Sequence, residues 1–341
     1  MSSDHTTILA GDIGGTKTRL AIFSSARGLD APVVEAAFPS REYPNLESLV
    51  REFLSRDGVG RTIDHASFGV AGPVVNGRAE ITNLPWVMDE ATLAEALGFS
   101  SVHLMNDLLA CACAVPSLHT SDLYTLNRGF SKPGGAIAVV APGTGLGEAY
   151  LTWDETGYRA HPSEGGHADY APTNALEAGL LRYLQNRFDH VSYERVCSGS
   201  GLPNIYAYLK EIGHAREPGW LAEQLAAVRD PTPVIVKAAL DADRPCALCQ
   251  ATLNLFISVL GAEAGNTALR VMASGGVYLG GGIPPRMVSA LQKGPFIDAF
   301  RRKGRMSGLM ERIPVHVIMN PGAALLGAAR YGMALRCKKE R

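Results

Sequence analysis

The stretch from Gly11 to Phe23 constrains the fold of this chain more than any other. A glycine-rich turn, Gly14-Gly15, separates two apolar runs of strand length, which predicts a β-hairpin. Glycines let the backbone approach a ligand closely, and a turn whose N–H groups converge on one point suits a phosphate. Asp12 fits such a turn if a divalent cation lies between its carboxylate and the phosphate.

Two better-known phosphate motifs do not match this turn. A Walker A loop places its lysine directly after the last glycine and continues into a helix. Here Thr16 stands between Gly15 and Lys17, and the residues that follow have the pattern of a strand. No glycine-rich turn of this chain is a G-x-G-x-x-G segment that opens a helix, so the Rossmann fingerprint also fails. Taken alone, the motif remains compatible with an ordinary glycine-rich hairpin.

Length and composition describe a two-domain globular protein. The chain has 341 residues, of which 46% are hydrophobic and 19% charged, and this is enough apolar sequence for a large core. A net charge of -1 gives no reason to expect nucleic acid or an anionic membrane as a partner. The polar N-terminus lacks a signal-peptide core, and no uninterrupted apolar run approaches the length of a membrane span.

The six cysteines do not have the spacing of a disulfide framework or of a zinc site. Cys246 and Cys249 form a C-x-x-C pair, but no second pair at metal-ligand spacing follows. Cys111 and Cys113 lie in an Ala/Leu-rich run that is typical of small core residues. The sequence therefore predicts no zinc and a reducing, cytoplasmic environment.

The chain mixes strand and helix patterns throughout, which indicates an α/β architecture. A second strand, Gly/Thr turn and strand surround Gly143-Thr144-Gly145, and we interpret this layout as a degenerate repeat of the first hairpin. Such a repeat predicts two similar domains facing each other. Residues 175–268 are expected to be mostly helical. A third glycine pair, Gly275-Gly276, is expected to follow a short strand at 271–273.

Several polar residues are candidates for chemistry, although each has an ordinary structural explanation. Asn106-Asp107 ends a strand and begins an apolar helix, so either residue could be a helix cap. Glu164 and His167 follow a polar loop, and the intervening glycines argue against a helical Glu-x-x-His metal pair. Glu194 lies at an expected helix start, where a glutamate is favoured by the helix dipole.

Taken together and in order, these motifs resemble those of the bacterial glucokinases, within the hexokinase, actin and heat-shock ATPase superfamily. GDIGGTKTRLAIF resembles the first phosphate motif of the family, APGTGLGEAYL the second, and VMASGGVYLGGG the adenosine motif. LMNDLLA and EGGHADYAP resemble the sugar-site motifs, and YERVCSGSGLPNIY resembles the segment with the last sugar contact. FGVAGPVVNGRAEITNLPW and NPGAALLGAARYG resemble the connecting segments, so the likeness spans nearly the whole chain.

The resemblance implies a role for each candidate residue. Asp107 is implied to be the general base toward the 6-hydroxyl of the sugar, and Asp12 to hold Mg²⁺ through water. The implied sugar contacts are Asn83, Asn106, Asp107, Glu164, His167 and Glu194. The implied nucleotide contacts are Gly11, Asp12, Ile13, Gly14, Gly15, Thr16, Lys17, Gly143, Thr144, Gly145, Gly275 and Gly276.

The same resemblance implies an overall design and an activity. It implies two α/β domains of the ribonuclease-H-like, actin-like ATPase fold with an interdomain cleft, which closes by a hinge motion. The small domain would be residues 1–111 with 323–341, and the large domain residues 112–322. The implied reaction is the first step of glycolysis: ATP and glucose give ADP and glucose 6-phosphate in a cytoplasmic homodimer. A sibling family carries a Cys-rich zinc motif after its E-x-G-H, but residues 168–188 contain no cysteine.

Three alternatives stay open at this point. The chain could be a kinase for mannose, fructose or an N-acetylated hexosamine. It could be a catalytically silent sugar sensor, although the presence of Asp107 argues against that. It could also be a filament-forming ATPase of the actin type, against which the sugar-site motifs argue.

Overall fold

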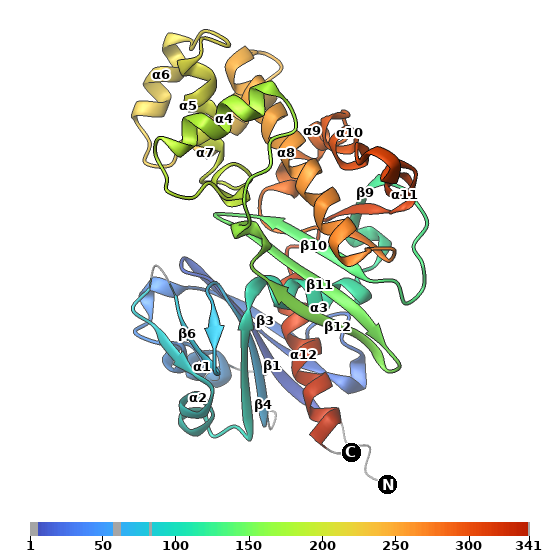
Figure 1. Cartoon of the computed structure of the whole chain (residues 1–341). Helices are drawn as coiled ribbons and strands as arrows, with labels where there is room; N and C mark the ends of the chain where they lie inside the picture. Colours follow the sequence, from blue (N-terminus) through green and yellow to red (C-terminus); the bar gives the residue numbers. More distant parts are fainter. Residues whose placement is uncertain (1–5, 57–62, 82–83, 340–341) are drawn as a thin grey trace. The chain divides into compact units, whose positions relative to one another are not determined.

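The structure, a computed structural model, describes residues 6–56, 63–81 and 84–339, and these form two compact units. Unit 1 extends to Asp122 and resumes at Asn320, and unit 2 is Leu123–Met319. The boundary expected at residue 111 falls inside helix α3 (Asp107–Ala114). That helix packs along α12 (Ala323–Lys339), so both belong to unit 1 and the division comes only after Asp122 (Figure 1).

The sheet of unit 1 has the strand order β3-β2-β1-β4-β8. The predicted hairpin is confirmed, because β1 (Thr7–Ile13) and β2 (Lys17–Ser24) pair antiparallel. β2 also pairs antiparallel with β3, whereas β1, β4 and β8 run parallel. The bounds of the other strands are β3 (Val34–Pro39), β4 (His65–Val70) and β8 (Ser101–Asn106), and a small separate sheet contains β5 (Val74–Val75), β6 (Arg78–Glu80) and β7 (Val87–Asp89).

Helices cover both faces of this sheet. α1 (Leu46–Ser55) begins where Asn45 accepts the Ser48 N–H at 2.9 Å, and its apolar residues recur at the three- and four-residue spacing of a buried helix face. α2 (Glu90–Leu97) is capped in the same way by Asp89. α3 and α12 lie on the opposite face, where Gly332 of α12 packs against Ile8.

The sheet of unit 2 repeats this layout and adds one strand, with the order β12-β11-β10-β13-β14-β9. β10 and β11 form the second hairpin, and β10, β13 and β14 run parallel, as β1, β4 and β8 do in unit 1. The interpretation of a degenerate repeat is therefore confirmed at the level of topology. The bounds are β9 (Leu123–Asn127), β10 (Ile137–Pro142), β11 (Leu146–Asp154), β12 (Gly157–Ser163), β13 (Gly276–Leu279) and β14 (Val315–Ile318).

Unit 2 also carries most of the helices, and α4 to α7 gather at one end of it (Figure 1). Their bounds are α4 (Ala175–Gln185), α5 (Leu202–Glu211), α6 (Gly219–Ala226), α7 (Thr232–Leu240), α8 (Ala247–Val271), α9 (Val288–Leu291), α10 (Pro295–Arg301) and α11 (Ser307–Arg312). By length and composition α8 could span a membrane, but 72% of its apolar window is buried inside the protein. A core helix passes the same test, and α8 packs against α5, α7 and α10.

The strand expected at residues 271–273 is wrong. Helix α8 continues to Val271 and ends at Met272, whose φ of 51° is left-handed and whose N–H closes onto the last turn of the helix. Strand β13 begins only at Gly276. Gly275 therefore precedes this strand and Gly276 is its first residue, so neither glycine follows a strand as expected.

The contact between α3 and α12 gives a first prediction. A Cβ added at Gly327 of α12 would fall on the carbonyl oxygen of Ala110, a backbone atom that cannot turn aside. We expect Gly327→Ala to lower the free energy of unfolding by about 1–3 kcal/mol through overpacking, a cost only partly offset by the better helix propensity of alanine. Urea unfolding measures the change.

The matched control is Gly308→Ala in α11, where an added Cβ would meet no atom within 4 Å. That variant is expected to gain up to about 1 kcal/mol from helix propensity. A Gly327→Ala protein as stable as the control would show that the two helices can separate at little cost.

Candidate functional site

The candidate residues divide between the two units, and each half is described by itself. In unit 1, the turn between β1 and β2 is held closed by its own backbone and by Ser40. The Gly14 N–H donates to the Lys17 carbonyl at 3.1 Å, and the buried Ser40 hydroxyl donates to the Gly14 carbonyl at 2.7 Å. The side chains of Thr16 and Lys17 remain exposed. The turn is thus fixed before any ligand arrives.

Two of the residues assigned to the nucleotide lie in the core of unit 1. The Ile13 side chain is fully buried, and a Cβ at Gly11 would meet the ring of Phe68 at 2.5 Å. Neither residue can offer a side chain to a ligand. Their part is to pack strand β1 so that the turn and Asp12 are held in place.

Asp12 and Asp107 are brought together by the parallel strands. Asp12 pairs with Gly69 of β4, and β4 in turn pairs with β8, which ends directly before Asp107. Gly69 lets the start of helix α3 lie close to β4, because a Cβ at Gly69 would lie 3.7 Å from the Asp107 Cα and 2.9 Å from the Ala110 Cβ. The carboxyl ends of adjacent parallel strands are where α/β proteins commonly bind ligands.

Burial perturbs both carboxyl groups. Burial and then the negative charge of Asp107 raise the pKa of Asp12 to about 6, while Arg19 opposes the shift. Burial also raises the pKa of Asp107, while hydrogen bonds from the Leu108 N–H and its own N–H lower it. Two carboxyl groups with raised pKa values beside a phosphate-type turn form a candidate catalytic and metal-binding pair.

Asn106 is the cap of helix α3. Its side-chain oxygen accepts the Leu108 N–H at 2.9 Å, and its amide donates to the Gly72 carbonyl at 3.1 Å. Asp107 also accepts the Leu108 N–H, at 2.8 Å, which orients its carboxyl group. Because Asn106 supplies the cap, the carboxyl group of Asp107 is not needed for that task. Asn83, the remaining candidate before the helix, lies outside the described residues.

In unit 2, the turn between β10 and β11 resembles the first one in construction. The Gly143 N–H donates to the Gly145 carbonyl at 2.8 Å, so this turn also closes on itself. The Gly199 N–H donates to the Gly143 carbonyl at 2.8 Å, and the Ser200 N–H to the Thr144 carbonyl at 3.3 Å. Sequence reasoning assigned this segment to the sugar and missed its support of the turn, although its Ser-Gly-Ser-Gly repeat at 198–201 is a visible signal.

Glu194 connects the second phosphate turn with the expected sugar residues. Its Oε2 accepts the Leu146 N–H at 2.9 Å, and a Cβ at Gly145 would fall on the same carboxylate. The Ser198 hydroxyl donates to the Glu194 carbonyl oxygen at 2.6 Å and holds its backbone. Glu194 is therefore part of the support of the turn as well as a candidate sugar contact.

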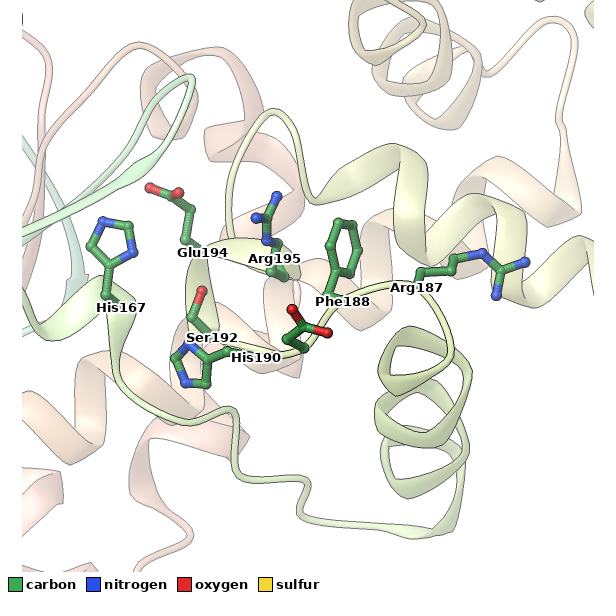
Figure 2. A pocket seen from close by; sticks show the side chains of 8 residues that line it. His167, Arg187, Phe188, His190, Ser192, Glu194 and Arg195 are labelled. Carbon is green, nitrogen blue, oxygen red and sulfur yellow. The ribbon is translucent and has the colours of Figure 1, made fainter.

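Glu164, His167 and Glu194 gather in one region of unit 2. A 3-10 turn at Gly165–His167 carries the first two, whose Oε2 and Nε2 atoms are 4.0 Å apart. Their side chains are 87% and 60% exposed, so both are available to a ligand. Figure 2 shows His167 and Glu194 at the same end of a pocket of about 380 Å³, while Arg187 points away at the other end.

The structure separates Gly275 and Gly276 from the second phosphate turn. Gly276 pairs with Ile137 at the start of β10, whereas Gly143 follows the end of that strand. At about 3.3 Å per residue the two glycines are some 20 Å apart along the sheet, so the adenosine assignment of Gly275 and Gly276 is corrected.

A later glycine run in the same motif occupies the correct end of the sheet. The Gly280 N–H donates to the Val140 carbonyl at 3.0 Å, and the Ile283 N–H to the Pro142 carbonyl at 3.4 Å. Gly281 has a φ of 79°, and a Cβ there would meet the Pro142 carbonyl oxygen at 2.6 Å. Gly280–Gly282 therefore lie against the Gly143 turn and replace Gly275-Gly276 as candidate nucleotide contacts.

The described cysteines are not gathered with other metal-ligating side chains. Within residues 6–56, 63–81 and 84–339, no three His, Cys, Asp or Glu side chains are placed to hold an ion together. Cys246 and Cys249 are buried at the start of α8, and Cys197 is buried beside Tyr193 in the core of unit 2. Asp12 could still hold a magnesium ion whose other ligands are water and nucleotide, since Mg²⁺ commonly keeps several waters.

Comparisons with known proteins agree with the motifs. The sequence model of the family described as Glucokinase matches residues 9–335. A protein of Trichormus variabilis named glucokinase is 40% identical over 338 residues, which cover 95% of this chain and 98% of the relative. A glucokinase of Yersinia enterocolitica is 35% identical and covers 95% of each chain.

Solved structures show the same architecture. The crystal structure of a glucokinase from an Antarctic psychrotroph aligns with a TM-score of 0.82 at 32% identity and covers 96% of this chain and 99% of the other. A glucokinase of Balamuthia mandrillaris, solved in complex with glucose, aligns with a TM-score of 0.72 at 23% identity, over 97% of this chain and 95% of the other. The second likeness concerns the fold alone, and together they confirm the predicted fold class.

Proposed function

This chain belongs to the glucokinase family, and we propose that it transfers the terminal phosphoryl group of ATP to the 6-hydroxyl of glucose. The products are glucose 6-phosphate and ADP. The observation that carries the proposal is the pair Asp12 and Asp107, two half-buried carboxyl groups with raised pKa values beside a rigid glycine turn. Phosphoryl transfer needs this combination of a proton acceptor, a metal partner and a phosphate cradle.

Asp107 is the proposed general base. A carboxylate whose pKa is raised by burial holds a proton more strongly than an ordinary aspartate, so it accepts the proton of the 6-hydroxyl more readily. The Leu108 N–H orients its carboxyl group. The sugar oxygen bonds to the γ-phosphorus of ATP as the P–O bond to the β-phosphate breaks and ADP leaves, and the hydroxyl proton passes to the Asp107 carboxylate.

The other hydroxyl groups of glucose are proposed to bind Asn106, Glu164, His167 and Glu194. Carboxylates, an amide and an imidazole supply the donors and acceptors that a ring of hydroxyls requires. A site built in this way strongly rejects analogues that lack a hydroxyl, because its own polar groups would then be left unpaired. The phosphates are proposed to rest on Gly14–Lys17 and on Gly143–Gly145, and the adenosine beside Gly280–Gly282.

Asp12 is the proposed partner of Mg²⁺. Its carboxyl group lies beside a second acid, with Arg19 as the cation that opposes their charge, and a divalent ion would relieve that repulsion. When bound, the ion would neutralise charge on the phosphates of ATP. Asp12 would hold it through water, and no described cysteine contributes.

The Mg²⁺ requirement gives a second prediction. EDTA is expected to abolish activity and added Mg²⁺ to restore it. Protonation of Asp12, whose pKa is about 6 without metal, should weaken the apparent Mg²⁺ affinity by up to about tenfold at pH 5 relative to pH 7. Asp12→Asn should remove that acid dependence and raise the Mg²⁺ needed for half-maximal rate. Metal analysis of the purified protein that found stoichiometric zinc would contradict the assignment.

One assay tests the function and its alternatives. ADP release is measured with ATP and, in turn, glucose, mannose, fructose and N-acetylglucosamine. We expect the highest kcat/KM with glucose, and a higher value with another sugar would make this a different hexose kinase. Calorimetric binding of glucose without turnover would instead indicate a sugar sensor.

We further propose a cytoplasmic homodimer, on the basis of the family resemblance. Sedimentation velocity with and without ATP tests the assembly. A species of twice the chain mass is the expected result, and long polymers that require ATP would favour the filament-forming alternative.

A further inference from the structure

A buried pair of acids lies beneath the loop that carries Glu164 and His167. Glu148 of β11 is 2% exposed, and Glu263 of α8 is fully buried. Arg270 pairs with the Oε1 of Glu263 at 2.7 Å, and the Thr267 hydroxyl lies 3.4 Å from the Oε2 of Glu148. The other oxygen of Glu148, Oε1, is buried and accepts no hydrogen bond in the described part of the chain. Arg270 thus forms its ion pair with Glu263 and not with Glu148.

The surroundings of Glu148 favour its neutral form. Burial and then the negative charge of Glu263 raise the pKa of Glu148 to about 8, while Arg270 opposes the shift. The groups around Glu148 are Glu263, Thr267 and Arg270 of α8, Ser163 of β12, and Cys197. The further groups around Glu263 are Tyr193, Asn266 and Lys303. Lys303 donates to the Ala262 carbonyl and to Asn266 instead of to either acid.

The loop rests directly on this pair. A Cβ at Gly165 would fall on the Oε2 of Glu148, and a Cβ at Gly166 on the Leu146 carbonyl oxygen, so no side chain separates the loop from β11. The Ser163 hydroxyl accepts the Gly165 N–H at 3.1 Å. A cavity of about 660 Å³, lined by Glu148, Gly165 and Arg270 among others, borders the same place and gives an ionised carboxylate somewhere to move.

We propose that Glu148 is a positioning residue for the sugar: its neutral carboxyl group supports Gly165 and thereby places Glu164 and His167 for binding. An ionised Glu148 would be a second negative charge beside Glu263, which already forms the ion pair with Arg270. An imperfectly paired buried charge is costly, so the carboxylate turns toward the cavity and the loop follows. The proposal rests on the proposed function, because it takes Glu164 and His167 as glucose contacts.

The test compares the wild-type protein with Glu148→Gln, which has the same shape and cannot ionise. Glucose and ATP affinities are measured by calorimetry, and KM and kcat by ADP release, between pH 7 and pH 9. With a pKa of about 8, only about one molecule in ten keeps the proton at pH 9. For the wild type, the apparent glucose affinity should therefore fall about tenfold and the KM for glucose should rise about tenfold, with ATP affinity unchanged. Glu148→Gln should show no such dependence.

The control is Glu155→Gln, which changes an exposed glutamate of the same β11–β12 hairpin and should keep the wild-type profile. A Glu148→Gln protein that retains the alkaline loss of glucose affinity would overturn the proposal, and so would an equal loss of ATP affinity. Calorimetry reports glucose binding even without turnover, so a failure of the kinase assignment is distinguishable from a failure of the role of Glu148.

A second test measures thermal unfolding without any ligand. Because the pKa of Glu148 is raised above its ordinary value of 4.5, the stability that its proton gives is present below that pH and lost as the pH rises to about 8. The Tm of the wild type should therefore fall more than that of Glu148→Gln over this range. Parallel Tm curves for the two proteins would show that Glu148 is not held neutral.

Discussion

Replacing Asp107 by asparagine is expected to lower kcat by about 10²- to 10⁴-fold. Asparagine keeps the size of the side chain and can still accept the Leu108 N–H, so the start of α3 should stay intact. It cannot take the proton of the 6-hydroxyl. Glucose affinity, measured by calorimetry, should change little because binding does not require that proton transfer.

The matched control is Asp89→Asn, at the start of α2 in the same unit. Asp89 caps its helix through the Thr92 N–H, and asparagine is an equally good cap, so kcat should not change. Near-normal turnover in Asp107→Asn would remove Asp107 from the role of base. A loss of both turnover and Tm would point instead to a structural role at the end of β8.

The second large effect is expected from Glu164→Ala, which should weaken glucose binding by about 10- to 100-fold. Hydrogen bonds that involve a charged group contribute about 1.5–3 kcal/mol, and Glu164 is proposed to accept such bonds from the sugar. ATP affinity should be nearly unchanged, because the turn at Gly143–Gly145 is held by Glu194 and by the backbone of Gly199 and Ser200. Calorimetric titration of each ligand measures both values.

Glu194→Ala gives a comparison in which both ligands should be affected. Glu194 accepts the Leu146 N–H directly after the phosphate turn, so its removal should weaken the binding of ATP as well as of glucose. Glu155→Ala, in an exposed part of the β11–β12 hairpin, should affect neither ligand. If Glu164→Ala kept full glucose affinity, or lost ATP affinity instead, its carboxylate would belong to a different site.

The sequence alone determined the features that depend on neighbours along the chain. The two glycine hairpins and the cap at the start of α3 follow from local backbone preferences and from short-range hydrogen bonds. The repeated layout of strand, glycine turn and strand was visible for the same reason. Such features need no knowledge of the fold, because a turn, a cap or a strand period is decided within a few residues.

Local reasoning failed where strand order in the sheet decides position. A short apolar run before Gly275 has the composition of a strand, but it is the end of α8, so the glycine pair begins β13 instead of ending a strand. Only the parallel pairing of β13 with β10 shows that Gly276 lies at one end of the sheet and Gly280 at the other. Periodicity over three residues cannot distinguish these two cases.

The tertiary structure also decided the electrostatics. Asp12 and Asp107 are far apart in the sequence, and they meet because β1 and β8 both flank β4. Glu148 looked like an ordinary strand residue, and only its burial against Glu263 and beneath Gly165 gives it a raised pKa and a place under the sugar loop. A pKa depends on solvent exclusion and on charges brought near by folding, and neither is encoded in the spacing of residues along the chain.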